Sequence, residues 1–518
     1  MIEAAQVPPL PQWRLVKRLS SFPQESASSR EQVNSGSFIE PTDEAFTEVL
    51  VPVIVGCALF MELLDSTVIT TALPAMARSL HEDPIKLNLA ITSYLLSLAV
   101  FIPLSAWVAD RFGARTVFRS AIVIFTIGSV LCGFSQSLPE LVAARILQGC
   151  GGAMMVPVGR LVILKTVPKR HLVTAMSYLS IPALIGPVVG PPVGGFIVTY
   201  STWRWIFFIN VPICMIGIVL VTLFIENIHE DFVPPLDLLG FVLTGVGLAA
   251  LVFGFESVGR GELPLWLTFA LMAGGAAFMG LYVLHYRRTA HPIINLGLLA
   301  IPTFRVSTVG GGLFRMGIGA MPFLLALLLQ LAFGINPFKS GLIIFASAVG
   351  ALTMKLGINP IIRLFGFRSV LIFNGVISAL FMASCALFRP TTPHFLIALA
   401  LFSGGFFRSL QFTCINALAY ADVPHPLMSN ASSLASMGQQ LTISVGVAIA
   451  ALALRVGMMM HSSKVLTAHD ITPAFLLTGG LGLIGAFVFL PLPRDAAAEL
   501  AGRRFHRTLE EEPTALAD

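Results

Sequence analysis

IPALIGPVVGPPVGGFIVTYSTWRWIFFINVP occupies residues 181–212 and combines two patterns that decide the fold of this chain. The first is an apolar run in which glycine and proline recur, and the second is an aromatic corner that leads into another apolar run. In water such a run predicts a poor helix, because proline removes a helical hydrogen bond and glycine adds unfolded-state entropy. In lipid, glycine lets a neighbouring backbone come close, and neighbouring helices shield the carbonyls that proline leaves free. The stretch therefore indicates a kinked, closely packed membrane helix.

The rest of the chain has the same apolar character. Of its 518 residues 56% are hydrophobic and 11% are charged, and the mean hydropathy is +0.85. A soluble domain carries about 25% charged residues. Runs of about 20 apolar residues, enough to span the hydrocarbon core of a bilayer, centre near residues 60, 97, 126, 152, 188, 216, 246, 274, 318, 348, 378, 404, 440 and 481. The sequence thus predicts an all-α polytopic membrane protein with about fourteen transmembrane helices.

Composition excludes several other classes of protein. The net charge of +5 does not indicate a nucleic-acid partner, because the basic residues lie at the ends of apolar segments, where anionic lipid attracts them. All six cysteines fall inside apolar segments without a CxxC pair, which favours core packing over a metal or disulfide site. There is no Walker A stretch and no Ser-His-Asp or HExxH arrangement in a suitable context. We therefore expect no enzyme activity, no ATP drive, no metal and no cofactor.

The distribution of basic residues predicts the orientation in the membrane. They concentrate after the second, fourth, eighth and tenth apolar segments and in the C-terminal tail, whereas the alternate loops carry fewer. By the positive-inside rule both termini lie in the cytoplasm of a multi-pass plasma-membrane protein, for which a bacterial inner membrane is expected. One loop disagrees: the stretch from Glu226 to Asp237 is acidic but falls on the cytoplasmic side. Acidic residues count little in this rule, so the orientation is retained.

A short internal repeat supports a two-part organisation. The loop DRFGART at residues 110–116 follows the second apolar segment, and RLFGFRSV at residues 363–370 follows the tenth. The two loops become equivalent if the seventh and eighth helices are inserted between two six-helix halves. The resulting division is a disordered cytoplasmic tail (1–46), a six-helix bundle (47–226), two inserted transmembrane helices (227–290), a second six-helix bundle (291–492) and a cytoplasmic tail (493–518).

Parallel six-helix repeats are the layout of the major facilitator superfamily, and the chain resembles its fourteen-helix drug:proton antiporter family over about residues 47–492. The motifs that carry the resemblance are LLDSTVITTALP (63–74), ITSYLLS (91–97), ADRFGART (109–116), RILQGCGGA (145–153), GPVVGPPVGG (186–195) and WRWIFFINVP (203–212). The sequence departs from the family pattern at Thr70, Ala106 and Ala114. The resemblance implies a major facilitator fold of two six-helix bundles plus two extra central helices. It also implies multidrug efflux driven by the proton gradient.

Two acidic residues of the first helix are candidates for proton coupling. A charge within hydrocarbon costs roughly 2.5–3.5 kcal/mol, so it needs a partner or a function. Glu62 and Asp65 are three residues apart, on one face of a helix. A carboxyl group in a partly dry cavity can load and release a proton near neutral pH. The resemblance places Asp65 on the proton or substrate pathway. The structural alternative is that Asp65 caps a break near Thr67 or hydrogen-bonds a neighbouring helix.

Arg145 in the fourth helix, with Gln148 one turn further, is the third candidate for proton coupling. The resemblance ties this arginine to coupling. A fixed guanidinium beside a carboxylate favours its charged form, and moving the two groups apart favours proton uptake. The alternative is an arginine that binds backbone carbonyls at a helix end.

Two further motifs are assigned by the resemblance. The cytoplasmic loop with Asp110, Arg111, Gly113 and Arg115 is expected to be a charge-latched gate, although a basic loop that only sets the topology is the alternative. The antiporter-motif helix contains Gly186, Pro187, Gly190, Pro191, Gly194 and Gly195. We expect its small surface to close the outer half of the protein against the second bundle and so to prevent proton leak.

Cations in the second half raise a question about the substrate. Arg315, Lys355 and Arg408 fall in apolar segments, where they form either ion pairs between helices or a cavity that accepts anions. Ion pairing is the expectation, because unpaired buried cations are costly. The candidates for a substrate cavity are Tyr94, Gln148, Arg315, Gln330, Arg408 and Gln440.

The sequence thus predicts a proton-coupled secondary active exporter of amphipathic small molecules or drugs that works by alternating access. The alternative is a proton symporter or facilitator for a metabolite. A membrane enzyme or receptor is disfavoured, because neither a catalytic constellation nor a sizeable soluble domain is present. The expected partners are a small-molecule substrate, protons and the lipid bilayer, with no nucleic acid. The identity of the substrate and the participation of a periplasmic adaptor protein are left open.

Overall fold

The computed structural model describes residues 41–82, 86–228, 230, 232–260, 263–460, 466–493 and 495–500. These residues form helices and connecting loops, with no β-strand among them. The long helices are α2 (Pro41–Leu80), α3 (Asn88–Phe101), α4 (Ser105–Phe112), α5 (Ala114–Phe134), α6 (Leu138–Thr166), α7 (Leu172–Tyr200), α9 (Asn210–Phe224), α10 (Leu238–Arg260), α11 (Leu265–Arg288), α12 (Pro302–Ala326), α13 (Pro337–Lys355), α14 (Ile358–Ser384), α15 (His394–Leu418), α16 (Met428–Met460) and α17 (Ala468–Phe487). Short elements join them: η2 (Ile102–Leu104), η3 (Lys169–His171), α8 (Trp205–Phe208), η4 (Leu296–Ala300), η5 (Leu327–Ala332), η6 (Cys385–Leu387) and η7 (His425–Leu427).

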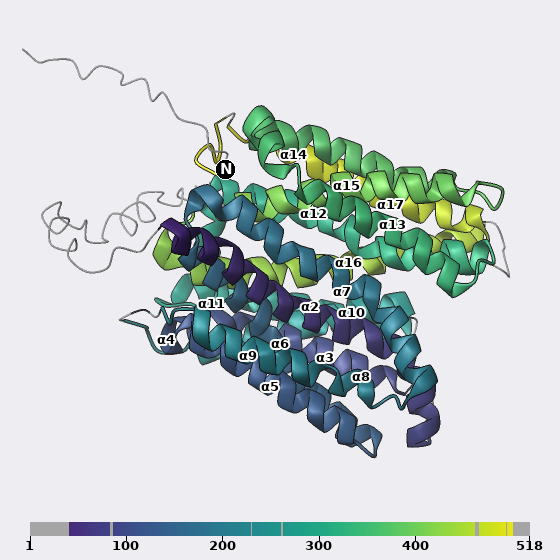
Figure 1. The fold of residues 1–518 in the computed structure, drawn as a ribbon, viewed down its shortest axis with the longest axis horizontal. Coiled ribbons are helices and arrows are strands. Elements are labelled where there is room, and N and C mark those ends of the chain that lie inside the picture. The colour runs from purple at the N-terminus through teal and green to yellow at the C-terminus, as the bar shows by residue number, and fades with distance from the viewer. Residues whose placement is uncertain are drawn as a thin grey trace, which may run out of the picture. The chain divides into compact units, whose positions relative to one another are not determined.

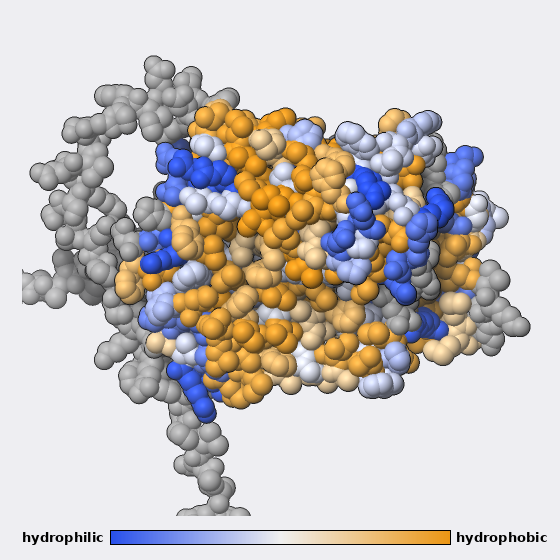
Figure 2. All heavy atoms as spheres, turned by 90° about the horizontal axis from the view of Figure 1, so that it is seen from below, coloured by the Kyte–Doolittle hydropathy of each residue, from blue (hydrophilic) through white to orange (hydrophobic). Residues whose placement is uncertain are grey.

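The helices confirm the class of polytopic membrane protein. In the part of the chain that the structure describes, 12 helices are long and apolar enough to cross a membrane. The other two predicted segments correspond to α7 and α13, so the number fourteen stays a prediction. Figure 2 shows hydrophobic side chains over the middle of one face, with hydrophilic ones gathered toward its two ends. This is the surface expected of a protein whose middle lies in hydrocarbon.

Residues Thr47–Asp518 form one compact unit, in which the helices group into two bundles. The first bundle comprises α2–α9, and the second comprises α12–α17 (Figure 1). In the second bundle α12 packs on α16 and α17, α13 packs on α15, and α14 packs on α15 and α17. Most of the predicted N-terminal tail lies outside the described residues. Helix α2 begins at Pro41, within the range assigned to that tail. Of the predicted C-terminal tail, residue 494 and residues 501–518 lie outside the described part.

Backbone geometry at two glycines supports the internal repeat. Gly113 has φ 87° and separates the short helix α4 from α5. Gly366 has φ 77° and separates the first eight residues of α14 from the rest of that helix. Residues with a Cβ rarely adopt this conformation, so glycine is required at the turn in both loops. The two loops that echo each other in sequence therefore also share a backbone conformation.

Helix α10 connects the two bundles, because it packs on α11, on α3 of the first bundle and on α16 of the second. Asp237 fixes the start of this helix. Its Oδ1 accepts a hydrogen bond from the Gly240 amide at 2.8 Å and lies 2.8 Å from Nε2 of His285 in α11. Its Oδ2 accepts from the Ile293 amide at 3.3 Å. The two central helices are thus joined to each other at one end.

Candidate functional site

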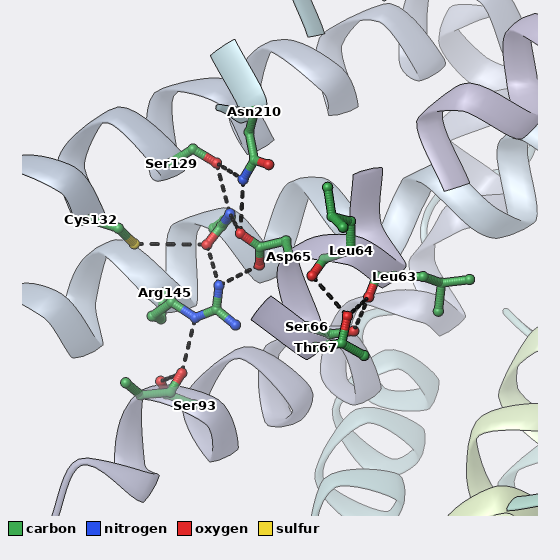
Figure 3. Close-up of polar contacts among 12 residues, drawn as sticks. Leu63, Leu64, Asp65, Ser66, Thr67, Ser93, Ser129, Cys132, Arg145 and Asn210 are labelled. Atoms are coloured by element: carbon green, nitrogen blue, oxygen red, sulfur yellow. Dashed lines mark hydrogen bonds and ion pairs between the residues drawn. The ribbon is translucent and has the colours of Figure 1, made fainter. Parts of the chain in front are cut away.

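An ion pair between α2 and α6 lies at the centre of the first bundle (Figure 3). Nη1 of Arg145 lies 2.6 Å from Oδ2 of Asp65, and the exposed fractions of the two side chains are 0% and 1%. A charged side chain inside a membrane costs free energy. Such residues are therefore rare there, are usually paired and often mark a functional site. The structure therefore joins two of the three residues that the sequence predicted for proton coupling.

Side chains from α6 and α9 donate hydrogen bonds to the Asp65 carboxylate. Nε2 of Gln148 in α6 donates to Oδ1 of Asp65 at 2.9 Å and to Oγ of Ser129 in α5 at 2.7 Å. Nδ2 of Asn210, at the start of α9, donates to Oδ1 of Asp65 at 2.8 Å and to Ser129 at 3.2 Å. Each bond to Asp65 is a charge-assisted hydrogen bond, and Ser129 joins the two donors. The network therefore connects α2, α5, α6 and α9 around Asp65.

The guanidinium of Arg145 is also held by groups other than Asp65. Its Nε donates to the Ala90 carbonyl of α3 at 3.0 Å, and Nη1 donates to Oε1 of Gln148 at 2.6 Å. Its Cζ lies 4.3 Å from the centroid of the Tyr94 ring, which is the geometry of a cation–π contact. Nη2 is buried without a hydrogen-bond partner. Arg145 thus has contacts with α3 and Gln148 that do not depend on Asp65.

Glu62 lies outside this hydrogen-bond network. Its side chain is buried, and Oε2 has no hydrogen-bond partner in the described structure. The hydroxyl of Tyr94 is likewise buried without a partner. Helix α2 continues unbroken past Thr67, whose hydroxyl donates to the Leu63 carbonyl at 2.9 Å. The capping alternative for Asp65 is therefore wrong, whereas its hydrogen bonds to neighbouring helices are present.

The predicted gating loop contacts the second bundle. Oδ1 of Asp110 accepts a hydrogen bond from the hydroxyl of Ser429 in α16 and lies 3.6 Å from Nζ of Lys165 in α6. Lys165 also pairs with Glu230 at 2.8 Å, and the Glu230 amide donates to the Asp110 carbonyl at 3.2 Å. The acidic loop that disagreed with the charge rule thus supplies a carboxylate to a basic side chain at this end. We call Asp110, Lys165, Glu230 and Ser429 the latch.

The other residues of the loop have different surroundings. Nη1 of Arg115 donates to the Ile225 carbonyl at 3.3 Å. A Cβ on Gly113 would overlap the Asn227 side chain, whose Oδ1 accepts from the Thr116 amide at 3.1 Å. Arg111 is exposed, and no residue that the structure describes is its hydrogen-bond or ion-pair partner. Asp110 and Gly113 thus lie in contact with other parts of the protein, whereas the side chain of Arg111 is exposed and has no described partner.

Further hydrogen bonds join the bundles at the end where the latch lies. Their donors and acceptors come from η2, α6, η3 and α7 on one side and from α14, α16 and the turn after α15 on the other. They are Arg160–Tyr420 (3.2 Å), Arg160–Gln439 (3.4 Å), Lys169–Ala421 (3.2 Å), Asn359–Thr174 (2.9 Å), Ser432–Pro157 (2.7 Å) and Ser433–Ile102 (3.0 Å). The protein is therefore closed between its bundles at the predicted cytoplasmic end.

The glycine face of α7 packs on α2 of the same bundle. A Cβ would meet the Phe60 carbonyl at Gly186, overlap the Thr67 hydroxyl at Gly190 and overlap the Thr71 hydroxyl at Gly194. These glycines are four residues apart and so share one face of the helix. The expected seal against the second bundle is therefore not what these glycines form in this structure. Gly195 faces open space, and the side chains of Pro187 and Pro191 lie outside the described part.

The uncharged candidates for the substrate cavity, Tyr94, Gln148, Gln330 and Gln440, are not brought into one site. Tyr94 and Gln148 belong to the surroundings of Arg145. Nε2 of Gln330 donates to Ser340 at 3.5 Å, in the π-helical segment η5. Gln440 has no hydrogen-bond partner among the described residues, whereas its neighbour Gln439 accepts from Arg160.

The three cations of the second half bind neutral side chains. Arg315 donates to Asn416 at 2.7 Å, Lys355 to Thr413 at 2.5 Å and Arg408 to Ser347 at 2.9 Å. No described carboxylate lies within 4.0 Å of any of them. The expectation of ion pairs between helices is therefore wrong for this structure, because the neighbouring helices supply hydroxyl and amide oxygens instead.

Sequence reasoning missed several residues of these contacts, among them Ser129, Arg160, Asn210 and Ser429. Arg160 could have been found, because it is a charged residue within the apolar run MMVPVGRLVIL. Ser129 and Asn210 also lie in apolar segments. Single uncharged polar residues are common there, so the sequence does not indicate which residues they contact. Ser429 lies in a loop-like polar stretch and carries no signal by itself.

Comparisons with known proteins agree with this architecture. The family model described as Major Facilitator Superfamily matches residues 55–321 and 307–515. A relative from Salmonella paratyphi B, which carries the name multidrug resistance protein MdtD, is 36% identical over 462 residues, covering 88% of this chain and 97% of its own. The relative of the same name from Salmonella heidelberg gives the same figures.

Two solved structures have a similar fold. The human organic anion transporter MFSD10 (TETRAN) has a TM-score of 0.60 at 14% identity, covering 87% of this chain and 100% of its own. The proton:xylose symporter XylE, solved with 6-bromo-6-deoxy-D-glucose, has a TM-score of 0.61 at 16% identity, covering 89% and 99%. At these identities the likeness concerns the fold alone.

Proposed function

The chain belongs to the major facilitator superfamily, and from this premise we propose that it is a proton-coupled antiporter that exports amphipathic small molecules or drugs. Membership makes it a multi-pass membrane transporter rather than an enzyme. The direction of transport and the coupling to protons are the proposal. The relatives named for multidrug resistance support an exported drug-like substrate.

The observation that carries the proposal is the buried pair of Asp65 and Arg145. As a carboxylate, Asp65 is held by Arg145, Gln148 and Asn210. A proton on Asp65 removes the negative charge that attracts Arg145, so the pair loses most of its attraction. Because the two residues lie on α2 and α6, proton binding changes the packing of these helices. This links the proton to the rocking of the first bundle against the second.

Closure at the latch end indicates which half of the cycle this conformation represents. Contacts between the bundles cluster around Asp110, Arg160 and Tyr420. In alternating access the bundles close on one side while the other side is open. We infer a conformation that is closed toward the cytoplasm and in which Asp65 awaits a proton from outside. Inward opening must break the latch and the bonds near it.

We retain the orientation and division expected from the sequence as part of the proposal. Both termini lie in the cytoplasm, and the protein is placed in a bacterial inner membrane. The division into bundles at 47–226 and 291–492, with inserted helices at 227–290, agrees with the two groups of helices and with the position of α10 between them.

The test is transport by purified protein in proteoliposomes. A pH gradient is imposed with the membrane potential clamped at zero, and the movement of ethidium, rhodamine 123 and fluorescein is followed. An antiporter accumulates its substrate on the acidic side, because protons leave that side as substrate enters. Accumulation of substrate on the alkaline side would identify a symporter. Substrate movement that does not depend on the pH gradient would identify a facilitator. Liposomes with the Asp65→Asn protein are the control.

A further inference from the structure

Three basic side chains, Arg408, Arg315 and Lys355, lie along α15. Arg408, Phe412 and Asn416 are four residues apart and so form one stripe, about 12 Å long at 1.5 Å per residue. Arg408 is itself a cation. Arg315 of α12 joins the stripe, because its Nη2 donates to Asn416 and its Cζ lies 5.8 Å from the Phe412 ring centroid. Lys355 of α13 donates to Thr413, beside the stripe.

The chain that follows the stripe reaches the first bundle at Tyr420, in the turn after α15. The Tyr420 hydroxyl accepts a hydrogen bond from Arg160 of α6 at 3.2 Å. Tyr420 also lines a cavity of about 420 Å³ between the α6–α7 and α15–α16 connections, together with Lys169 and His425. The segment just beyond the stripe therefore contacts the first bundle and a cavity at the latch end.

The positive charge of the stripe is not neutralised by the protein. No described carboxylate lies within 4.0 Å of Arg160, Arg315, Lys355 or Arg408. Nε of Arg315 is buried without a hydrogen-bond partner, in a side chain that is more than nine-tenths buried. A buried guanidinium with neither counter-charge nor full hydrogen bonding is costly.

The sequence offers no hidden counter-charge in this half of the protein. Between Pro302 and Phe487 the acidic residues are Asp422 and Asp470. Asp422 accepts a hydrogen bond from Thr303 at 2.9 Å, and Asp470 forms the capping box of α17 with Thr467. Both carboxylates therefore have structural partners away from the stripe.

We propose that Arg408 of the stripe, with Arg315 and Lys355 next to it, binds the acidic group of an anionic amphipath, which makes organic anions the exported substrate class. This inference rests on the proposed function. A carboxylate or sulfonate would supply the missing negative charge and could accept the free Nε–H of Arg315. Phe412 beside Arg315 offers an aromatic face to the apolar part of the same molecule.

The test uses two dyes that share the xanthene ring but differ in charge, the anion fluorescein and the cation rhodamine 123. Binding is measured by fluorescence anisotropy in phosphatidylcholine nanodiscs, with empty nanodiscs subtracted. We expect saturable fluorescein binding by the wild-type protein. Arg315→Gln and Lys355→Gln should each raise its Kd at least about tenfold, which corresponds to about 1.4 kcal/mol. Arg305→Gln is the matched control, because Arg305 is exposed on the same helix as Arg315 and should leave the Kd unchanged.

Several outcomes would overturn the inference. These are no saturable binding of fluorescein, tighter binding of rhodamine 123, or equal fluorescein binding by the wild-type and Gln variants. Arg315→Lys guards against misfolding, since it keeps the charge and should restore most of the affinity that Arg315→Gln loses. Rhodamine export driven by a pH gradient without fluorescein binding would leave the proposed function standing and remove the anion site. Fluorescein binding without transport driven by a pH gradient would support the anion site and contradict the proposed proton-coupled function.

Discussion

Asp65 of α2 and Arg145 of α6, eighty residues apart in the chain, form a 2.6 Å ion pair that is almost completely shielded from solvent. Removing one partner of such a pair leaves a buried charge uncompensated, which costs roughly 3–5 kcal/mol. Adding a proton to Asp65 has a related effect, because it removes the negative charge while the carboxyl group stays in place. Binding of a single proton to Asp65 can therefore change how α2 and α6 pack against each other.

Asp65→Asn should abolish proton coupling while leaving the protein able to exchange substrate. Asparagine has the shape of the protonated acid but cannot release a proton. With one coupled proton and a one-unit pH gradient, the wild-type protein can accumulate substrate about tenfold, since one unit corresponds to about 1.4 kcal/mol. The variant should show no accumulation in proteoliposomes whose membrane potential is clamped at zero.

Exchange of labelled for unlabelled substrate across Asp65→Asn proteoliposomes is the control for folding. It should proceed at a rate comparable to that of the wild-type protein. Accumulation that persists in the variant would show that another group, with Glu62 as the first candidate, carries the proton.

A double-mutant cycle should reveal strong coupling between Asp65 and Arg145. Arg145→Gln alone leaves the Asp65 carboxylate without its cation, and Asp65→Asn alone leaves Arg145 without its anion. Each should lower the thermal unfolding temperature in detergent. The double variant should be more stable than the sum of the two losses by about 0.5–3 kcal/mol, the range typical of directly contacting residues.

Arg145→Lys distinguishes charge from geometry in the same measurement. Lysine keeps the positive charge but cannot reproduce the separate Nε and Nη1 bonds to Ala90 and Gln148. The Arg145→Lys protein should therefore unfold at a lower temperature than the wild-type protein. Additive single and double variants would contradict a coupled pair.

Cross-linking Thr174 to Asn359 should stop transport by locking the closed end. Nδ2 of Asn359 lies 2.9 Å from Oγ1 of Thr174, so α14 of the second bundle meets α7 of the first there. Cysteines at both positions, joined by a short bis-methanethiosulfonate reagent, should abolish transport, and a reducing agent should restore it. The background should carry Cys57→Ser, because Cys57 is exposed.

Each single-cysteine variant treated with the same reagent controls for modification alone and should keep its activity. Full transport by the cross-linked double variant would mean that this end does not open during the cycle. That result would contradict the proposed alternation.

Gly190→Ala should impair both stability and transport, because a Cβ there overlaps the Thr67 hydroxyl of α2. Overpacking of this kind costs about 1–3 kcal/mol. Combining it with Thr67→Ala removes the closest overlapping atom, the hydroxyl oxygen, and should recover part of the loss, since the Thr67 Cβ stays 2.9 Å away. The measurements are thermal unfolding in detergent and transport in proteoliposomes.

Gly195→Ala is the matched control for that series, because nothing lies within 4 Å of a Cβ at Gly195. It should behave like the wild-type protein, although both glycines belong to the same motif. Equal impairment at Gly190 and Gly195 would show that helix flexibility, rather than contact with α2, is what the motif requires.

Much of the architecture could be predicted from local patterns. The apolar segments, the loop echo at 110–116 and 363–370, and the motifs from Leu63 to Pro212 depend on composition and spacing, which the chain displays directly. The candidates Asp65 and Arg145 were found because a charge in an apolar segment is conspicuous. Arg315, Lys355 and Arg408 were found for the same reason, but the sequence does not indicate which side chains they bind.

The sequence by itself determined that this chain is a helical membrane protein, because the length and hydropathy of a segment decide whether it can span a bilayer. Tertiary structure alone decided which charges meet. Asp65 is bound by Arg145 and Gln148 of α6 and by Asn210 of α9, whereas the cations along α15 have no described carboxylate within 4.0 Å. Helix α7 of the opening motif turned its glycines toward α2 rather than toward the second bundle. Such pairings depend on how helices rotate and cross when they pack, and the linear order of residues does not specify that.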